Sequence, residues 1–328
     1  MRQDQHAKTV MYVGAAVVGV VALGFTLPVI AAAVSATVST VSLYTAATAV
    51  GTLLASLFIH QMMGTITQMN RINNLYKAYK YQPSVFLIAI LTSFLGLMFT
   101  IITRKSLGLV FLLLGIEIVL IVVSRIILNR ILAKVNNLIE EDIDFASYLT
   151  FYQMDYNSST GLRKRNALRN LYFAKSRVLY YTGKFENCLL ELDKMDQTIV
   201  NKMSQSSPLQ AGLLRILAKI QLNLDYESDL SNFSERVVKG DALNDFKNSS
   251  LVSINRISTI EKGNVIENLD FGDEVTKLAS ISQKYYNALN EVNSGNLSNA
   301  IIYFSEIKDE NSELFYVKEA IKFLEENK

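Results

Sequence analysis

The chain has 328 residues, of which half are hydrophobic and 19% are charged, whereas an ordinary soluble domain carries about 25% charged residues. Residues 1–128 hold 8 Lys and Arg against 2 Asp and Glu, a net charge of +6. Residues 129–328 hold the other 24 Lys and Arg against 28 Asp and Glu, a net charge of −4. One Cys and two His exclude a disulfide framework, a CxxC site and a His-rich metal centre. This composition predicts a membrane half followed by a soluble half, with no metal and no other cofactor.

Four apolar segments in the first 128 residues are each long enough to cross a bilayer as a helix. Such a helix needs about 20 apolar residues, and no Asp, Glu, Lys or Arg occurs between Thr9 and Asn70. The four predicted spans cover residues 10–34, 38–59, 85–103 and 107–128. A helical connection over residues 60–82 joins the second span to the third. Basic residues at the N-terminus, in the connection and after the fourth span share one side, which the positive-inside rule makes cytoplasmic. The predicted location is therefore the cell membrane, with both termini in the cytoplasm.

Two features inside these spans are candidates for packing or function. Ala47, Gly51 and Ala55 recur every four residues, a pattern of small residues that lets helix backbones approach closely. We predict that they pack within the bundle, and a homo-oligomer contact is the alternative. Glu117 is the one acid in a predicted span, where a carboxylate is costly. We predict a structural role for Glu117, with transport as the alternative.

The start of the chain has a second interpretation. Basic residues precede the first apolar run, and Val34-Ser35-Ala36 resembles a signal-peptide cleavage site. The apolar run is about twice as long as that of a usual signal peptide. Retention of the first span is the favoured prediction, and cleavage would leave three spans.

The soluble half is predicted to be helical. Residues 129–159 are expected to form a juxtamembrane helix and linker, and residues 160–328 a cytoplasmic domain. Helices separated by short Gly or Asx breaks are predicted over residues 167–181, 185–195, 280–292, 297–307 and 313–326. The predicted fold is therefore all-α: a four-helix transmembrane bundle followed by a cytoplasmic helical domain.

The break at Gly295 and its flanking helices resemble the tetratricopeptide repeat. That family stacks pairs of antiparallel helices of about 34 residues, with small residues where the helices cross. With Gly295 as the glycine between two helices, Ala288 and Ala300 occupy the small positions and Phe304 the large aromatic one. The resemblance implies a stack of helix pairs over residues 160–328, in which each unit contacts only its neighbours.

A second turn, at Gly183, matches this family less well. Cys188 and Leu192 stand where the family usually has Ala and an aromatic residue. The first-helix Trp and the terminal Pro of the family are missing, and the breaks are unevenly spaced. The resemblance therefore implies a degenerate repeat without the family's peptide-binding residues, and a plain helical bundle is the alternative.

A cluster of basic residues lies at and before the first predicted helix of the soluble half. The cluster contains Arg163, Lys164, Arg165, Arg169, Lys175 and Arg177, of which the first four are the candidate lipid contacts, and its residues spread around the helix instead of lining one face. A solvated surface paired with nearby acids is the favoured interpretation of this cluster, and binding of anionic lipid headgroups is the alternative. Nucleic-acid binding is not expected, because the soluble half is acidic as a whole.

Known catalytic motifs are missing from the sequence. It contains no P-loop, GxGxxG, HExxH or GxSxG pattern, and helical stacks of this kind are interaction surfaces. We predict a membrane-anchored scaffold or adaptor, not an enzyme, whose cytoplasmic domain binds a protein partner. A small transporter or channel subunit that uses Glu117 is the alternative. The Asn-, Ile- and Lys-rich soluble half and the absence of Trp favour a bacterial source.

Overall fold

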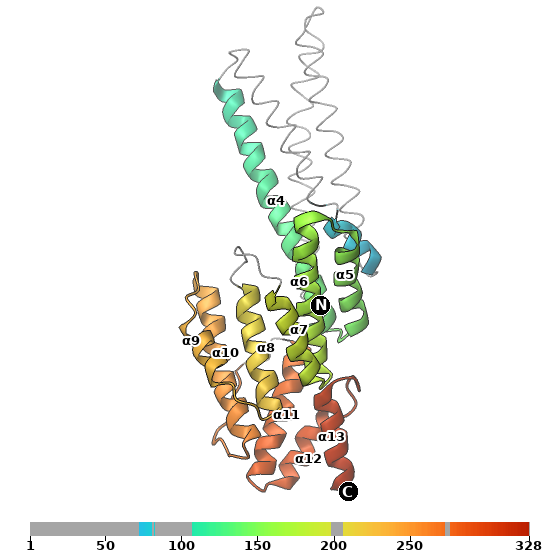
Figure 1. The fold of residues 1–328 in the computed structure, drawn as a ribbon, viewed down its shortest axis with the longest axis vertical. Helices are drawn as coiled ribbons and strands as arrows, with labels where there is room; N and C mark the ends of the chain where they lie inside the picture. Colours follow the sequence, from blue (N-terminus) through green and yellow to red (C-terminus); the bar gives the residue numbers. More distant parts are fainter. Residues whose placement is uncertain (1–71, 81, 83–106, 198–205, 273–275, 328) are drawn as a thin grey trace, which may run out of the picture. The chain divides into compact units, whose positions relative to one another are not determined.

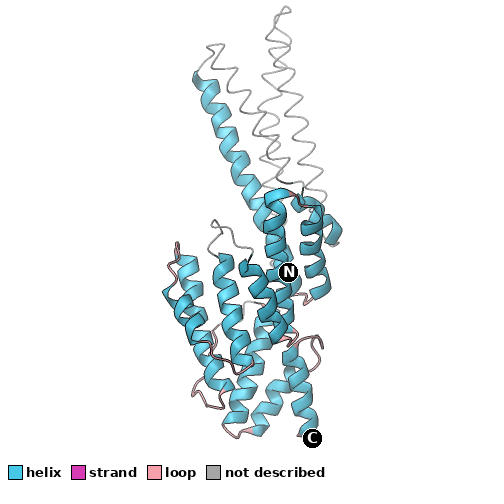
Figure 2. Cartoon of the chain, in the orientation of Figure 1, coloured by secondary structure: helices cyan, strands magenta, loops and turns pink. Residues whose placement is uncertain are grey.

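The computed structural model describes residues 72–80, 82, 107–197, 206–272 and 276–327. All regular secondary structure in these ranges is helical (Figures 1 and 2), which confirms the all-α class. Two compact units divide the chain, one over residues 1–133 and the other over residues 134–328. Helix α4 (Leu107–Glu140) crosses this division without a break.

The first unit is described over a short helical segment and the first part of α4. Residues 72–80 and 82 are helical, and the side-chain amide of Gln82 donates to the backbone oxygen of Ser124 at 3.1 Å and to the Ser124 hydroxyl. The predicted spans over 10–34, 38–59 and 85–103 lie outside the described residues, as do Ala47, Gly51 and Ala55.

The membrane part of the predicted fold is wrong. In the part of the chain that the structure describes, every helix is too short or too polar to cross a membrane. The prediction treated the apolar run over 107–128 as one complete span. That run is the first part of a 34-residue helix, which continues through the charged Arg130 and Lys134 to Glu140 in the second unit, as the predicted juxtamembrane helix would, but its described residues are not apolar enough to cross a membrane. A four-span bundle is therefore not part of the observed fold.

The second unit is built from helices joined by short connections. After the end of α4 these are α5 (Phe145–Ser158), α6 (Gly161–Tyr181), α7 (Phe185–Gln197), α8 (Ser206–Gln221), α9 (Glu227–Glu235), α10 (Asp241–Glu261), α11 (Lys277–Asn293), α12 (Leu297–Ile307) and α13 (Phe315–Glu326). The residues predicted as a linker contain α5, which packs on α6. The chain runs through α5 to α10 and then returns, so that α11, α12 and α13 lie beneath α5 to α7 in Figure 1.

The two turns predicted from glycine are confirmed as helix–turn–helix hairpins, α6–α7 and α11–α12. Gly183 has a φ of 79° and Gly295 a φ of 78°, both in the left-handed region. In each turn the glycine amide and the next amide donate to carbonyls of the preceding last helical turn, at 3.0 and 2.8 Å after α6 and at 3.0 and 2.9 Å after α11. This pattern ends many helices and favours glycine, because a Cβ is strained there.

The small and apolar residues predicted at the helix crossings are buried in these hairpins. Ala288 and Ala300 are fully buried between α11 and α12, and Phe304 is 1% exposed. Cys188 and Leu192 are fully buried on α7. Two helices can approach closely at alanine, so packing accounts for these residue types.

The end of the chain packs against its first hairpin, which the repeat resemblance did not imply. The Phe315 ring at the start of α13 lies edge-on to Tyr180 and Phe185, with centroids 6.0 and 5.1 Å apart. A Cβ on Gly183 would lie 2.9 Å from the Phe315 Cβ, and Lys318 donates to the Thr182 carbonyl at 3.4 Å. The aromatic rings bury their large apolar surfaces against one another, so the helices close into one body instead of an open stack.

A sharp corner joins α4 to α5, and distant residues hold it. Ile143 has a φ of 51° and is 3% exposed; positive φ is unusual for a β-branched residue. Its carbonyl accepts a hydrogen bond from the Asn311 side chain at 2.9 Å. Glu140 pairs with Arg177 of α6 at 3.1 Å, and Arg177 also donates to the Tyr148 hydroxyl at 3.1 Å. The corner thus belongs to the core of the second unit.

Candidate interaction surface

A groove opens between α9 and α10. Both helices pack on α8, and the space left between them measures about 590 Å³. Apolar side chains of both helices line part of this groove, namely Leu230, Leu251 and Ile254. Ile254 is 1% exposed, and the other two are half-buried. The groove therefore has an open side and a lining in which these three apolar residues stand among polar ones.

The end of the groove near the start of α9 is polar. The Tyr226 hydroxyl and the Ser258 hydroxyl are 2.5 Å apart, so one donates to the other. The Lys262 ammonium lies 5.6 Å from the centroid of the Tyr226 ring and 3.4 Å from its hydroxyl. The ring faces a cation, which is a favourable arrangement. Glu227 also lines this end, and its side chain is exposed.

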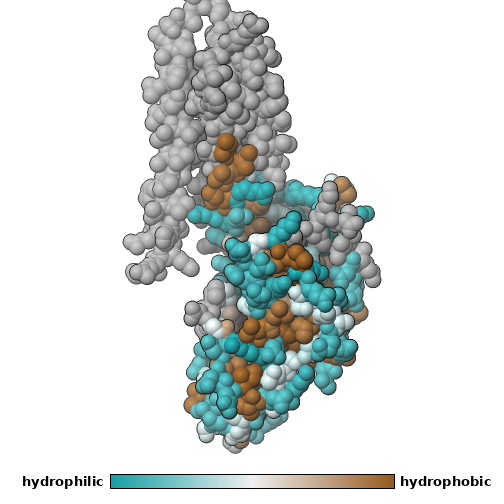
Figure 3. All heavy atoms as spheres, turned by 90° about the vertical axis from the view of Figure 1, so that its left-hand side faces the viewer, coloured by the Kyte–Doolittle hydropathy of each residue, from teal (hydrophilic) through white to brown (hydrophobic). Residues whose placement is uncertain are grey.

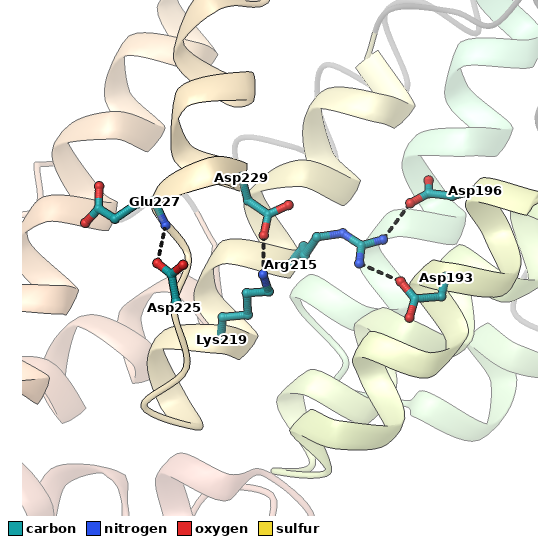
Figure 4. Close-up of polar contacts among 7 residues, drawn as sticks. All are labelled: Asp193, Asp196, Arg215, Lys219, Asp225, Glu227 and Asp229. Atoms are coloured by element: carbon teal, nitrogen blue, oxygen red, sulfur yellow. Dashed lines mark hydrogen bonds and ion pairs between the residues drawn. The ribbon is translucent and has the colours of Figure 1, made fainter.

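A line of charged residues connects this end of the groove to α8 and α7 (Figure 4). Arg215 of α8 donates to Asp193 and Asp196 of α7, at 2.6 Å each. Burial raises the pKa of the Asp196 carboxyl, and the Arg215 charge opposes that change. Lys219 of α8 pairs with Asp229 of α9 at 2.6 Å. These pairs fix α7 and α9 on either side of α8.

The balance of charge along this line is negative. Beyond the paired residues, Figure 4 shows Asp225 and Glu227, where the Asp225 carboxylate accepts the Glu227 backbone N–H at 3.1 Å. The seven residues drawn are five carboxylates and two cations. Both Asp225 and Glu227 are exposed, and no ion pair with a cation is found for either within the described ranges. This acidic edge is defined here as Asp193, Asp196, Asp225, Glu227 and Asp229.

Exposed apolar residues accompany the groove. The face of the second unit that carries α9 and α10 shows hydrophobic residues among hydrophilic ones (Figure 3). Val237 in the α9–α10 connection is 84% exposed, Val252 of α10 is 48% exposed and Val265 beyond α10 is 47% exposed. Isolated exposed apolar residues are common on proteins, and none of these three is among the residues that line the groove.

The structure divides the predicted basic cluster into residues with different surroundings. Arg163 pairs with Asp155 of α5 at 3.4 Å, and the Lys164 ammonium lies 5.0 Å from the centroid of the Tyr156 ring. Arg165 is exposed. Arg169 is half-buried, and burial lowers its pKa. All four cations lie in the first half of α6, but they do not form one uniform surface.

The remaining predicted residues lie elsewhere. Glu117 is within α4, and its side-chain surroundings lie outside the described part of the structure. Gly183, Cys188 and Leu192 belong to the α6–α7 hairpin, and Gly295, Ala288, Ala300 and Phe304 belong to α11–α12. None of these residues lines the groove.

The groove and the acidic edge were not identified from the sequence. One signal was present: Asp193 and Asp196 are three residues apart, and Arg215 and Lys219 are four apart, so each pair shares a helix face. Nothing in those spacings indicates that the two faces meet, because that depends on how α7 packs on α8. Within the described ranges, no cluster of three or more His, Cys, Asp and Glu is arranged to hold a metal ion.

Comparisons with known proteins do not assign the chain to a family. No protein-family model matches the chain, and searches of curated proteins and of solved structures find no match either. The helical structure does not by itself identify the tetratricopeptide family. The class that the fold defines is therefore an all-helical protein.

Proposed function

We propose that the second unit is a protein-interaction module that holds an amphipathic helical segment of a partner protein between α9 and α10. The observation that carries this proposal is the groove itself, open on one side and lined by Leu230, Leu251 and Ile254. An amphipathic helix bound in a groove buries apolar residues spaced three and four positions apart. The length of α10, 21 residues, provides one long wall.

Charge complementarity gives the partner segment its chemistry. The acidic edge adjoins the end of the groove at Glu227, and Asp225 and Glu227 are exposed. Lys or Arg at one end of a bound helix would face these carboxylates. Such rim charges affect the association rate and the choice of partner more than the final affinity. The proposed occupant is therefore a segment with an apolar stripe and a basic end.

The test uses two synthetic helical peptides and the full chain. Both peptides carry the same Leu stripe; one ends in Lys residues and the other in Glu residues. Fluorescence anisotropy should show tighter binding of the Lys peptide, with the difference shrinking as salt is raised. Leu251→Glu should abolish binding, because it places a charge in the groove lining, and Glu227→Lys should remove the preference for the Lys peptide.

The matched control is Ile302→Glu. Ile302 is 56% exposed on α12 and does not line the groove. Equal binding of the two peptides to the full chain would exclude the preference for a basic end, and binding that survives Leu251→Glu would show that the groove is not the recognition site.

Other functional predictions stay open. The membrane anchor is not part of this proposal, because it depended on the four-span bundle. Location at the cell membrane, formation of a homo-oligomer and the absence of catalysis remain predictions.

A further inference from the structure

We propose that the corner between α5 and α6 docks on an anionic lipid surface. This corner consists of residues 158–165 and is separate from the groove between α9 and α10. The lipid-docking proposal is therefore independent of the proposed function and is tested separately.

The tip of the corner exposes one large apolar side chain. Leu162, in the first turn of α6, is 78% exposed. Gly161 before it has a φ of 55°, and a Cβ added there would meet no atom within 4 Å. The backbone at this point is therefore open to solvent. Exposing Leu162 costs free energy in water, and an interfacial bilayer region would bury it.

Cations surround this apolar tip. Arg163, Lys164 and Arg165 follow Leu162 directly, and the first turn of α6 contains no acid. Arg163 and Lys164 reach back toward α5, to Asp155 and to the ring of Tyr156. The Arg163 side chain is nevertheless 48% exposed. The corner therefore retains a net positive charge.

Arg165 is the cation best placed to act with Leu162. Residues three apart lie on one face of a helix, so Arg165 shares the face of Leu162. Arg165 is exposed, and the described residues provide no acid that pairs with it. Arg169, the next residue along this face, is half-buried and contributes less.

A bilayer fits this combination better than a nucleic acid. Phosphate groups of either would attract the cations, but a nucleic acid backbone offers no apolar region for Leu162. Residues 129–328 also carry a net charge of −4, which disfavours a polyanion that would cover more than the corner. Each cation near an anionic bilayer strengthens binding about fivefold, and insertion of the Leu side chain adds to this.

The experiment places a fluorescent probe at the corner of the full chain. The one native Cys, Cys188, is fully buried, so Thr160→Cys provides a single reactive thiol, and Thr160 is exposed and makes no side-chain capping bond. An environment-sensitive dye on this thiol is recorded with vesicles of phosphatidylcholine alone and with vesicles containing one third phosphatidylglycerol. The expected result is a blue-shifted, brighter emission with the anionic vesicles, reduced by salt.

Variants in the labelled background separate the two contributions. Leu162→Ser should remove most of the shift, and Arg165→Glu should reduce the apparent vesicle affinity at least fivefold. The matched control carries the dye at Val237→Cys, an 84% exposed position in the α9–α10 connection, and should not respond to vesicles.

Three outcomes would overturn the proposal. An equal response to neutral and anionic vesicles would exclude recognition of charge. A response unaffected by Leu162→Ser would exclude insertion of the apolar tip. The same change produced by inorganic phosphate or by RNA without vesicles would show that the corner binds phosphate groups and not a bilayer.

Discussion

At the scale of single residues, Cys188 shows how burial controls chemistry. Its side chain is fully buried on α7, and burial raises the pKa of the thiol from 9.0 to about 12. The nearby Arg215 charge opposes this change but does not cancel it. Because the thiolate is the reactive form, Cys188 should be inert in the folded protein.

The first prediction concerns this thiol. A thiol reagent at pH 8 should not modify Cys188 until denaturant unfolds the chain, whereas Thr160→Cys should be modified at once. The unfolded chain loses the thiol proton above pH 9 and the folded chain keeps it to about pH 12. The free energy of unfolding should therefore fall as pH rises through this window.

The matched comparison is Cys188→Ala, which lacks the titrating thiol. Its free energy of unfolding should fall less steeply from pH 9 than that of the wild type. Fast modification of the folded wild type at pH 8 would contradict the observed burial.

The second prediction concerns Asn290 of α11. Its side-chain amide donates to the Ile266 carbonyl at 3.0 Å and accepts from the Ile266 backbone N–H at 2.8 Å. Asn290→Leu would leave both backbone groups without this partner, so we expect a loss of about 1–3 kcal/mol in the free energy of unfolding. Denaturant titration measures this.

Asn299→Ala is the control for Asn290. The Asn299 side chain is exposed, and its bond to Glu291 is 3.3 Å long. Its replacement should change the free energy of unfolding by no more than about 0.5 kcal/mol. Losses of equal size in the two variants would mean that the two hydrogen bonds between Asn290 and Ile266 do not contribute to the free energy of unfolding.

At the scale of helices and hairpins, local sequence signals predicted some helix boundaries and missed others. The hairpins at Gly183 and Gly295 could be predicted, because a glycine after an apolar helical pattern indicates a helix end. The first predicted helix begins earlier than expected, at Gly161 instead of 167. The start of α6 could not be located from apolar periodicity, because its first turn contains the charged Arg163, Lys164 and Arg165.

The groove could not be predicted at this scale. Its apolar residues Leu230, Leu251 and Ile254 have ordinary helical spacing, and such residues are usually core. Whether they meet a neighbour depends on the space between α9 and α10, and both helices pack on α8. The sequence contains the residues of the groove but not the gap between the helices.

The third prediction tests the α11–α12 hairpin. Ala300 is fully buried where the two helices cross, so Ala300→Leu should force them apart and cost about 1–3 kcal/mol. Lys308→Ala, at the exposed end of α12, should change the free energy of unfolding by no more than about 0.5 kcal/mol. Thermal or chemical denaturation of both variants gives the comparison, and equal tolerance would argue against close packing at Ala300.

At the scale of the second unit, closure is the feature that local patterns did not reveal. The aromatic contacts of Phe315 connect α13 to a hairpin more than a hundred residues earlier in the chain. Each aromatic residue has an obvious local explanation as an apolar position on its own helix. The pairing between them is a long-range property, so the sequence favoured an open stack with neighbour contacts alone.

The fourth prediction follows from this closure. Phe315 is 6% exposed, and Phe315→Ala should cost about 3–5 kcal/mol. Hydrogen exchange should accelerate not only in α13 but also around Gly183, because Phe315 packs against that turn. An open stack would confine the change to the C-terminal helices.

Lys322→Ala is the control for Phe315. Lys322 is exposed on α13, and its replacement should leave exchange around Gly183 unchanged. Exchange that accelerates in α13 alone after Phe315→Ala would show that the first hairpin is stable without the C-terminal helix.

The position of Phe315 also has a consequence during synthesis of the chain. The first hairpin leaves the ribosome long before residue 315 has been translated. Until then, the apolar surface of Tyr180 and Phe185 that packs on Phe315 is exposed. Domains usually fold as units during synthesis, and exposed apolar surface on incomplete chains promotes aggregation. A nascent chain of this protein cannot complete its core in order from the N-terminus. The core that contains Tyr180 and Phe185 becomes fully protected only after α13 has been made.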